Sequence, residues 1–133
     1  MKVLFICKHN RFRSKVAEAF FNKYNKNKKH KAKSAGIIKG MPVLTKTALI
    51  VKEFGIKLPK ETRGVSEKDL YWQNIIVIVA DNVPKELFTS RPNLVKKVIV
   101  WKIKDAGVEE TEKIRNIINQ IDKKVKKFVR ELK

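Results

Sequence analysis

The residues best suited to chemistry lie together near the N-terminus, in the segment Cys7-Lys8-His9-Asn10-Arg11-Phe12-Arg13-Ser14. A buried strand is expected before this segment and a helix after it, so the segment would form a loop that curls into a helix N-terminus. The first N–H groups of a helix lack intrahelical partners and carry partial positive charge, so such a loop attracts an anion. The guanidinium of Arg13 would close this cradle, because its planar fork matches the oxygens of a phosphate.

Cys7 would lie at the base of that cradle. Cations and a helix N-terminus favour the thiolate, which is the nucleophilic form of cysteine, and the hydroxyl of Ser14 would donate to its sulfur. A thiolate beneath a bound phosphate is placed for in-line attack on phosphorus. The pattern therefore predicts hydrolysis of phosphate monoesters through a phosphocysteine at Cys7. The other residues predicted to bind phosphate or shape the loop are Lys8, His9, Asn10, Arg11, Phe12 and Ser14.

Cleavage of a phosphate ester also needs an acid for the leaving oxygen, and a positioned acid typically contributes about 10²–10⁴-fold. Asp105 follows the fourth predicted strand, so it would lie at the same edge of the sheet as Cys7. We expect Asp105 to protonate the leaving group and then, as a carboxylate, to activate the water that hydrolyses the phosphocysteine. Asp81 follows the third predicted strand and is a secondary candidate, whose simpler interpretation is a residue at the rim of the site.

Composition limits the classes to which the chain can belong. It has 133 residues, the size of one domain (1–133), and a single cysteine, so no internal disulfide can form. No apolar run approaches the ~20 residues of a membrane span, and the apolar N-terminus is too short for a signal peptide. We expect a cytoplasmic monomer without cofactor or metal and without membrane insertion. The formal net charge of +19 favours phosphorylated proteins or small phosphomonoesters as partners, with weak nonspecific binding of polyanions.

Hydrophobic patterns predict alternating strands and helices along the chain. Continuous apolar runs indicate buried parallel strands, and apolar residues at helical spacing indicate amphipathic helices. We place Pro42 in the first turn of the second helix and Gly55 just after its end. The expected strands are 2–6, 32–35, 75–80 and 98–101, and the expected helical segments are 14–24, 42–54, 66–70, 84–89 and a final helix that includes 114–132.

This alternation predicts a single-domain α/β fold, a three-layer sandwich in which helices cover both faces of a four-stranded parallel sheet. Ligands in such folds bind beyond the carboxyl ends of the strands. Cys7 lies at the carboxyl end of the first predicted strand, so the topology and the loop chemistry indicate the same place.

These features resemble the low-molecular-weight protein tyrosine phosphatase family and its relatives, the thioredoxin-coupled arsenate reductases. That family begins with a strand, then Cys-x2-Asn-x2-Arg-Ser and a helix that contains Ala-Glu, and this chain has Cys7, Asn10, Arg13, Ser14 and Ala17-Glu18. Further matches are Ser34-Ala35-Gly36, Phe54-Gly55-Ile56 and Asp105. The resemblance covers nearly the whole length, and it implies that Asn10 holds the backbone shape of the loop.

The chain also departs from the family pattern. His9 replaces a usual glycine, and Phe12 stands where the phosphatase branch often has a second cysteine. Asp105 is followed by Ala106-Gly107 instead of proline and aromatic residues, so a preference for phosphotyrosine stays open. The arsenate reductase branch uses two further cysteines, which this chain lacks. We therefore predict a cysteine-dependent phosphatase. The alternatives are an arsenate or other oxyanion reductase that uses an external thiol, and a non-enzymatic binder of phosphorylated ligands or nucleic acid.

Overall fold

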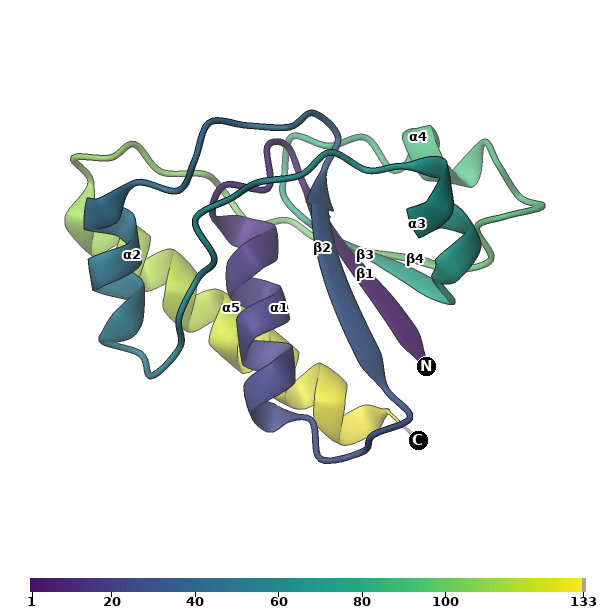
Figure 1. Ribbon diagram of the computed structural model, residues 1–133, viewed down its shortest axis with the longest axis horizontal. Coiled ribbons are helices and arrows are strands. Elements are labelled where there is room, and N and C mark those ends of the chain that lie inside the picture. Colours follow the sequence, from purple (N-terminus) through teal and green to yellow (C-terminus); the bar gives the residue numbers. More distant parts are fainter. Residues whose placement is uncertain (133) are drawn as a thin grey trace.

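The computed structural model describes residues 1–132, in which strands and helices alternate from end to end (Figure 1). The strands are β1 (Lys2–Cys7), β2 (Lys31–Gly36), β3 (Ile75–Val79) and β4 (Val98–Trp101). The helices are α1 (Arg13–Tyr24), α2 (Thr45–Lys52), α3 (Glu67–Trp72), α4 (Glu86–Thr89) and α5 (Thr111–Glu131). The predicted domain spans 1–133, and its last residue, Lys133, lies outside the described residues.

The four strands form one parallel sheet, as the sequence predicts, and the structure shows their order to be β2-β1-β3-β4. All five residues of β3 are buried, which explains why this strand is a continuous apolar run. Cys7 pairs with Gly36, and Val79 pairs with Trp101, so the carboxyl ends of the strands meet at one edge of the sheet. This edge carries the loop between β1 and α1, at the top of the sheet in Figure 1.

Helices cover both faces of the sheet and make it a three-layer sandwich. In Figure 1, α1, α2 and α5 lie on one side of the strands, and α3 and α4 lie on the other. Alternate side chains of β1 enter two separate cores, because Val3 and Phe5 pack beneath α1 and α5 while Leu4 and Ile6 pack towards α3 and α4. Both faces of β1 are therefore anchored directly before the loop that follows Cys7.

The largest error in the sequence prediction concerns the start of α2. Pro42 does not lie in the first turn, because α2 begins at Thr45 and its N-cap, Leu44, has an extended conformation. The preceding segment is held away from helical geometry by long-range contacts: the N–H of Val43 donates to the carbonyl of Lys60, and the carbonyl of Pro42 accepts from Arg11. The other helix and strand boundaries differ from prediction by a few residues at most.

The final helix confirms the strongest helical pattern in the sequence. The apolar face of α5 packs against α1 through residues that recur at helical spacing. These buried residues are Ile114, Ile117, Ile118, Ile121 and Val125. Among the helices of residues 1–132, none is both long enough and apolar enough to cross a bilayer.

Candidate active site

The loop between β1 and α1 is held from one side by residues 37–40. The carbonyls of Cys7, Lys8 and His9 each accept a hydrogen bond of 3.1 Å from a main-chain N–H of that segment. The planar peptide group points its carbonyl and its N–H in opposite directions. The N–H groups that follow these carbonyls are therefore directed away from residues 37–40.

Those N–H groups remain available for an anion. Within residues 1–132, the main-chain N–H groups of residues 8–15 donate no hydrogen bond to another residue. The N-cap of α1, Phe12, provides no side-chain acceptor, and the first turn of α1 contains no acidic residue. Free N–H groups gathered at a helix N-terminus attract anions, so the predicted phosphate cradle would lie here.

The loop backbone packs directly against Gly36, which explains why this position is a glycine. A Cβ atom on Gly36 would lie 2.5 Å from the carbonyl oxygen of Ile38, 2.7 Å from the carbonyl carbon of His9 and 2.8 Å from the main-chain nitrogen of Asn10. Distances this short to backbone atoms leave no room for a side chain. Gly36 therefore lets the end of β2 support the loop directly.

Cys7 and Ser14 form the base of the cradle. Cys7 is 2% exposed, and its Sγ lies 3.0 Å from Oγ of Ser14. The same oxygen accepts a hydrogen bond of 2.9 Å from Nδ2 of Asn10. Because Asn10 donates into the hydroxyl oxygen, the single hydroxyl proton of Ser14 is available for the sulfur. The Cys7 sulfur can therefore accept this hydrogen bond.

The guanidinium of Arg13 is buried and held in one orientation. It donates hydrogen bonds of 3.0 Å to the carbonyl of Ile103 and 3.0 Å to Oδ1 of Asn82. Asp81 lies 3.7 Å from Nη1, and Asp105 lies 3.6 Å from Nη2. Both predicted aspartates thus meet at Arg13. Asp105 is the more accessible, with its side chain 55% exposed against 39% for Asp81.

A cavity opens over the loop and contains most of the predicted site. Five loop residues line it together with Asp105, and its opposite wall comes from α2, the segment before α5 and the first turn of α5. The loop residues are Cys7, His9, Arg11, Phe12 and Arg13, and the opposite wall consists of Leu44, Thr47, Ala106, Val108 and Ile114. One carboxylate oxygen of Asp105 accepts the N–H of Ala106, and the other carries the contact with Arg13.

The remaining predicted residues lie around this cavity and do not line it. Asn10 and Ser14 are fully buried behind the loop, and Lys8 contributes its carbonyl to the contacts with residues 37–40. Asp81 contacts Arg13 from outside the cavity. The sequence analysis did not single out Asn82, although its position directly after Asp81 at the end of β3 would have placed it at this edge.

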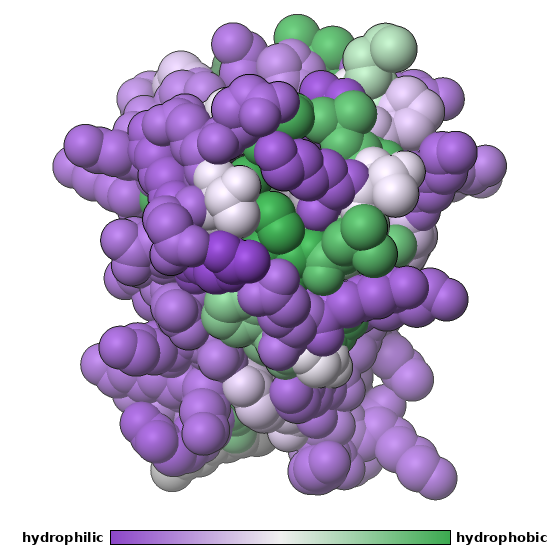
Figure 2. Space-filling view, turned by 90° about the vertical axis from the view of Figure 1, so that its left-hand side faces the viewer, coloured by the Kyte–Doolittle hydropathy of each residue, from purple (hydrophilic) through white to green (hydrophobic). Residues whose placement is uncertain are grey.

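The outer surface beside the cavity is apolar. Figure 2 views the side of the molecule that carries α2, and it shows apolar surface gathered in the upper half of that side, framed by hydrophilic side chains. Exposed apolar residues of α2 and of the segments before α2 and α5 are Leu49, Met41 and Val108.

Comparison with protein families agrees with this geometry. The family model described as low molecular weight phosphotyrosine protein phosphatase matches residues 2–133. The chain belongs to this family. The match includes every residue of the predicted site. No curated protein matches the chain in sequence.

Solved structures similar to this member of the low molecular weight phosphatase family include both phosphatases and arsenate reductases. An arsenate reductase from Archaeoglobus fulgidus is 32% identical, with a TM-score of 0.73 and coverage of 97% of this chain and 99% of the other. A low molecular weight protein tyrosine phosphatase from T. tengcongensis is 25% identical, with a TM-score of 0.85 and 99% of each chain covered. The arginine phosphatase YwlE from Geobacillus stearothermophilus, 16% identical over 98% of this chain and 91% of the other, shares the fold with a TM-score of 0.81.

Proposed function

We propose that this protein hydrolyses phosphate monoesters through a phosphocysteine at Cys7. The observation that carries the proposal is the convergence of three groups on one cavity: the Cys7 sulfur, the Arg13 guanidinium and the Asp105 carboxylate. The unpaired N–H groups of residues 8–15 supply the anion nest around them. Residues 1–132 contain no group of three or more histidine, cysteine or acidic residues placed to hold a metal ion.

The first chemical step forms a bond between sulfur and phosphorus. The Cys7 thiolate attacks the phosphorus while the loop N–H groups and Arg13 hold the nonbridging oxygens. The bond between phosphorus and the leaving oxygen breaks, and Asp105 gives that oxygen its proton. The hydroxyl of Ser14 stabilises the thiolate before attack and again when the sulfur leaves, because it lies 3.0 Å from Sγ.

The second step restores the cysteine. Asp105, now a carboxylate, removes a proton from a water molecule that attacks phosphorus, and the Cys7 thiolate departs as inorganic phosphate forms. The exposure of Asp105 suits this role, since solvent reaches its side chain. We assign Asp81 a different role, because it lies 3.7 Å from Nη1 of Arg13 and outside the cavity: it holds the guanidinium in place.

The entrance of the cavity favours a substrate with a second negative charge. His9 and Arg11 line the cavity, and Nε of Arg11 donates 3.1 Å to the carbonyl of Pro42. This bond fixes the guanidinium while its two terminal nitrogens have no acceptor within residues 1–132. The opposite wall is aliphatic, through Leu44 and Val108. We therefore propose phosphorylated proteins with acidic neighbours, or small phosphomonoesters with another anionic group, as substrates.

Reduction of an oxyanion is the second candidate, and the 32% identity to the arsenate reductase from Archaeoglobus fulgidus supports it. Cys7 is the single cysteine of the chain, so two external thiols must supply the electrons. Cys7 would displace one oxygen of arsenate as water and form a bond between sulfur and arsenic. One external thiol would then attack this sulfur, breaking the bond to arsenic, forming a mixed disulfide and releasing arsenite. The second thiol would reduce that disulfide, so that two electrons pass from the thiols to arsenic.

An aryl-phosphate assay with vanadate as competitor separates these candidates. Cys7→Ala is expected to abolish hydrolysis, and Asp105→Asn to lower kcat by about 10²–10⁴-fold. In Asp105→Asn, kcat should fall more for phenyl phosphate than for nitrophenyl phosphate, because nitrophenolate leaves without protonation. Glu109→Gln is the control, since Glu109 lies in the same segment but pairs with Lys46 at the surface. Hydrolysis by Cys7→Ala would contradict the proposal, and thiol-dependent arsenate reduction without ester hydrolysis would favour the second candidate.

A further inference from the structure

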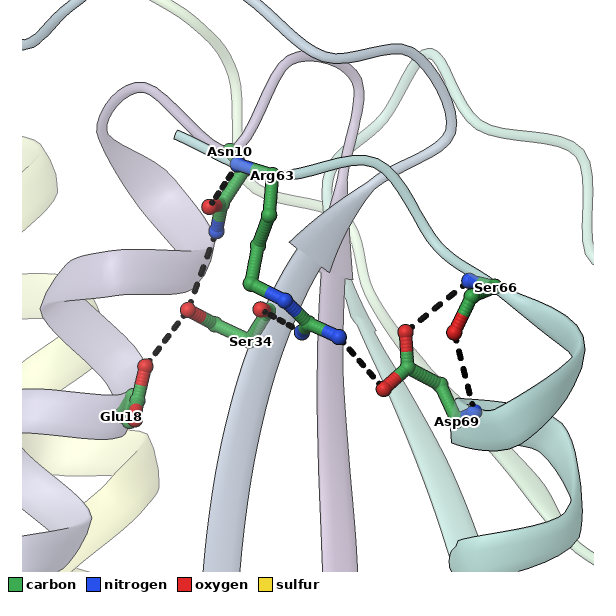
Figure 3. Close-up of polar contacts among 6 residues, drawn as sticks. All are labelled: Asn10, Glu18, Ser34, Arg63, Ser66 and Asp69. Carbon is green, nitrogen blue, oxygen red and sulfur yellow. Dashed lines mark hydrogen bonds and ion pairs between the residues drawn. The ribbon is translucent and has the colours of Figure 1, made fainter. Parts of the chain in front are cut away.

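A chain of polar contacts begins at Asn10, in the loop between β1 and α1 (residues 8–12, here called the phosphate loop), on the side away from the cavity (Figure 3). Asn10 has a φ of 56° and is the only non-glycine residue of 1–132 with a positive φ. Residues other than glycine adopt this conformation when their surroundings hold them in it. The Asn10 side chain is held on three sides: Nδ2 donates to Oγ of Ser14 at 2.9 Å and of Ser34 at 3.0 Å, and Oδ1 accepts the main-chain N–H of Arg63 at 3.0 Å.

Arg63 is attached to the end of β2 by both its main chain and its side chain. Its carbonyl accepts the N–H of Gly36 at 2.9 Å, and the N–H of Val65 donates to Gly36 in return at 2.7 Å. Its guanidinium donates to the carbonyl of Ser34 at 2.7 Å and to the carboxylate of Asp69 at 2.5 Å. The N–H that Arg63 presents to Asn10 therefore belongs to a segment fixed by its own side chain.

Asp69 completes the chain of contacts from α3. Its side chain is 2% exposed, and both carboxylate oxygens are used, one by Arg63 and the other by the N–H of Ser66 at 2.9 Å. Burial raises the pKa of Asp69, but the hydrogen bonds from Arg63 and Ser66 outweigh it and leave the pKa below its usual range. Asp69 thus gives Arg63 a fixed, ionised partner inside the protein.

We infer that Arg63 and Asp69 are positioning residues for Cys7. The pair fixes the Arg63 N–H, which orients the Asn10 side chain, which in turn holds the Ser14 hydroxyl against the Cys7 sulfur. Each link is a hydrogen bond of 3.0 Å or less: from Arg63 to Asn10, from Asn10 to Ser14 and between Ser14 and Cys7. Neither Arg63 nor Asp69 lines the cavity over the loop, so their effect passes through Asn10. The role in turnover rests on the proposed phosphatase activity.

A second ion pair on α3 provides a matched control. Arg91 binds both carboxylate oxygens of Glu67, and the side chains are 41% and 61% exposed, respectively. This pair joins α3 to the segment after α4 and has no contact with the phosphate loop. Both pairs combine an arginine with a carboxylate of α3, but Asp69 is buried and its pair reaches Asn10, whereas Glu67 is exposed and its pair does not reach Asn10.

The test compares Arg63→Met, Arg63→Lys and Asp69→Asn with Arg91→Met. Two quantities are measured on the purified protein at a temperature where circular dichroism shows it folded: kcat and KM for an aryl phosphate, and the pH dependence of Cys7 alkylation by iodoacetamide. We expect Arg63→Met to lower kcat about tenfold or more and to shift the alkylation midpoint to higher pH, as for a weakened hydrogen bond to a charged group. Arg63→Lys should be affected less than Arg63→Met in both kcat and the alkylation midpoint. Asp69→Asn should show the same two changes as Arg63→Met, and Arg91→Met should match the wild type in both.

Alkylation needs no turnover, so its outcome separates this inference from the proposed function. A shifted midpoint in a protein that hydrolyses no phosphate ester would support the positioning role while removing the phosphatase. Arg63→Met and Asp69→Asn variants that melt earlier, yet keep the wild-type kcat and alkylation midpoint, would overturn the inference, because the pair would then serve stability alone. The Arg63 side chain is 43% exposed, so its replacement leaves the two cores intact.

Discussion

Replacing Ser14 with alanine removes the hydroxyl next to the Cys7 sulfur and tests the electrostatics of the site. Ser14 is fully buried, and its Oγ lies 3.0 Å from Sγ, so water does not substitute for the lost donor. A hydrogen bond to a charged group contributes about 1.5–3 kcal/mol, and about 1.4 kcal/mol corresponds to a factor of ten in a rate. We therefore expect Ser14→Ala to lower the rate of Cys7 alkylation at neutral pH by about tenfold or more.

Iodoacetamide is the suitable reagent for this assay, because it is uncharged and is not attracted to the anion nest. The alkylation rate is followed across pH by mass spectrometry of the intact protein, which has one cysteine and therefore one site of modification by thiolate. Ser90→Ala is the control, since Ser90 is an exposed residue at the end of α4. An unchanged alkylation rate in Ser14→Ala, with the fold intact, would refute the reasoning and show that the hydroxyl does not donate to the sulfur.

Three further predictions concern the loop, the contact between α1 and α5, and the core. Gly36→Ala should lower kcat/KM for an aryl phosphate by at least about tenfold, because the new Cβ would displace the loop backbone, and displaced groups at a reacting centre lower the rate. Gly64→Ala should keep the wild-type kcat/KM, because its Cβ would meet its nearest atom at 3.4 Å. Burial and the hydrogen bond to Asp122 raise the pKa of Tyr24 to about 12. The ordinary pKa of tyrosine is near 10, so the stabilising contribution of Tyr24 is complete below about pH 10 and is lost as pH rises towards 12. In chemical denaturation, the free energy of unfolding should fall less over this pH range in Tyr24→Phe than in the wild type, and equal falls would count against this role of Tyr24. Phe5→Ala should lower the free energy of unfolding by about 3–5 kcal/mol, because this ring is fully buried among aromatic neighbours, and a loss below about 1 kcal/mol in urea titration would contradict that packing.

The sheet and the position of the loop between β1 and α1 were predictable from local patterns. The run Ile75–Val79 is apolar at every position because both faces of β3 are covered, and the final helix keeps its apolar spacing because one face packs on α1. The types and spacing of Cys7, Arg13 and Ser14 indicated an anion cradle without any knowledge of distant residues. These elements were predictable because their own residue patterns reflect the burial that the fold imposes on them.

The errors and omissions arose where contacts between distant residues decide the structure. Pro42 suggested a helix start, but contacts with Arg11 and Lys60 keep its segment extended. Arg63 has no local feature that marks it, because its N–H meets Asn10, 53 residues earlier in the chain. The capping box of α3 was detectable, since Ser66 and Asp69 have the required spacing, but the sequence does not show that Asp69 also binds Arg63.

The covalent state of Cys7 during turnover tests the central claim most directly. The wild-type protein is mixed with an aryl phosphate, quenched within the first turnovers and analysed by mass spectrometry of its peptides. The account predicts one phosphoryl group, attached to Cys7, which disappears as inorganic phosphate is released, and none in Cys7→Ala. Hydrolysis that proceeds with Cys7 unmodified, or with the phosphoryl group on another residue, would contradict it.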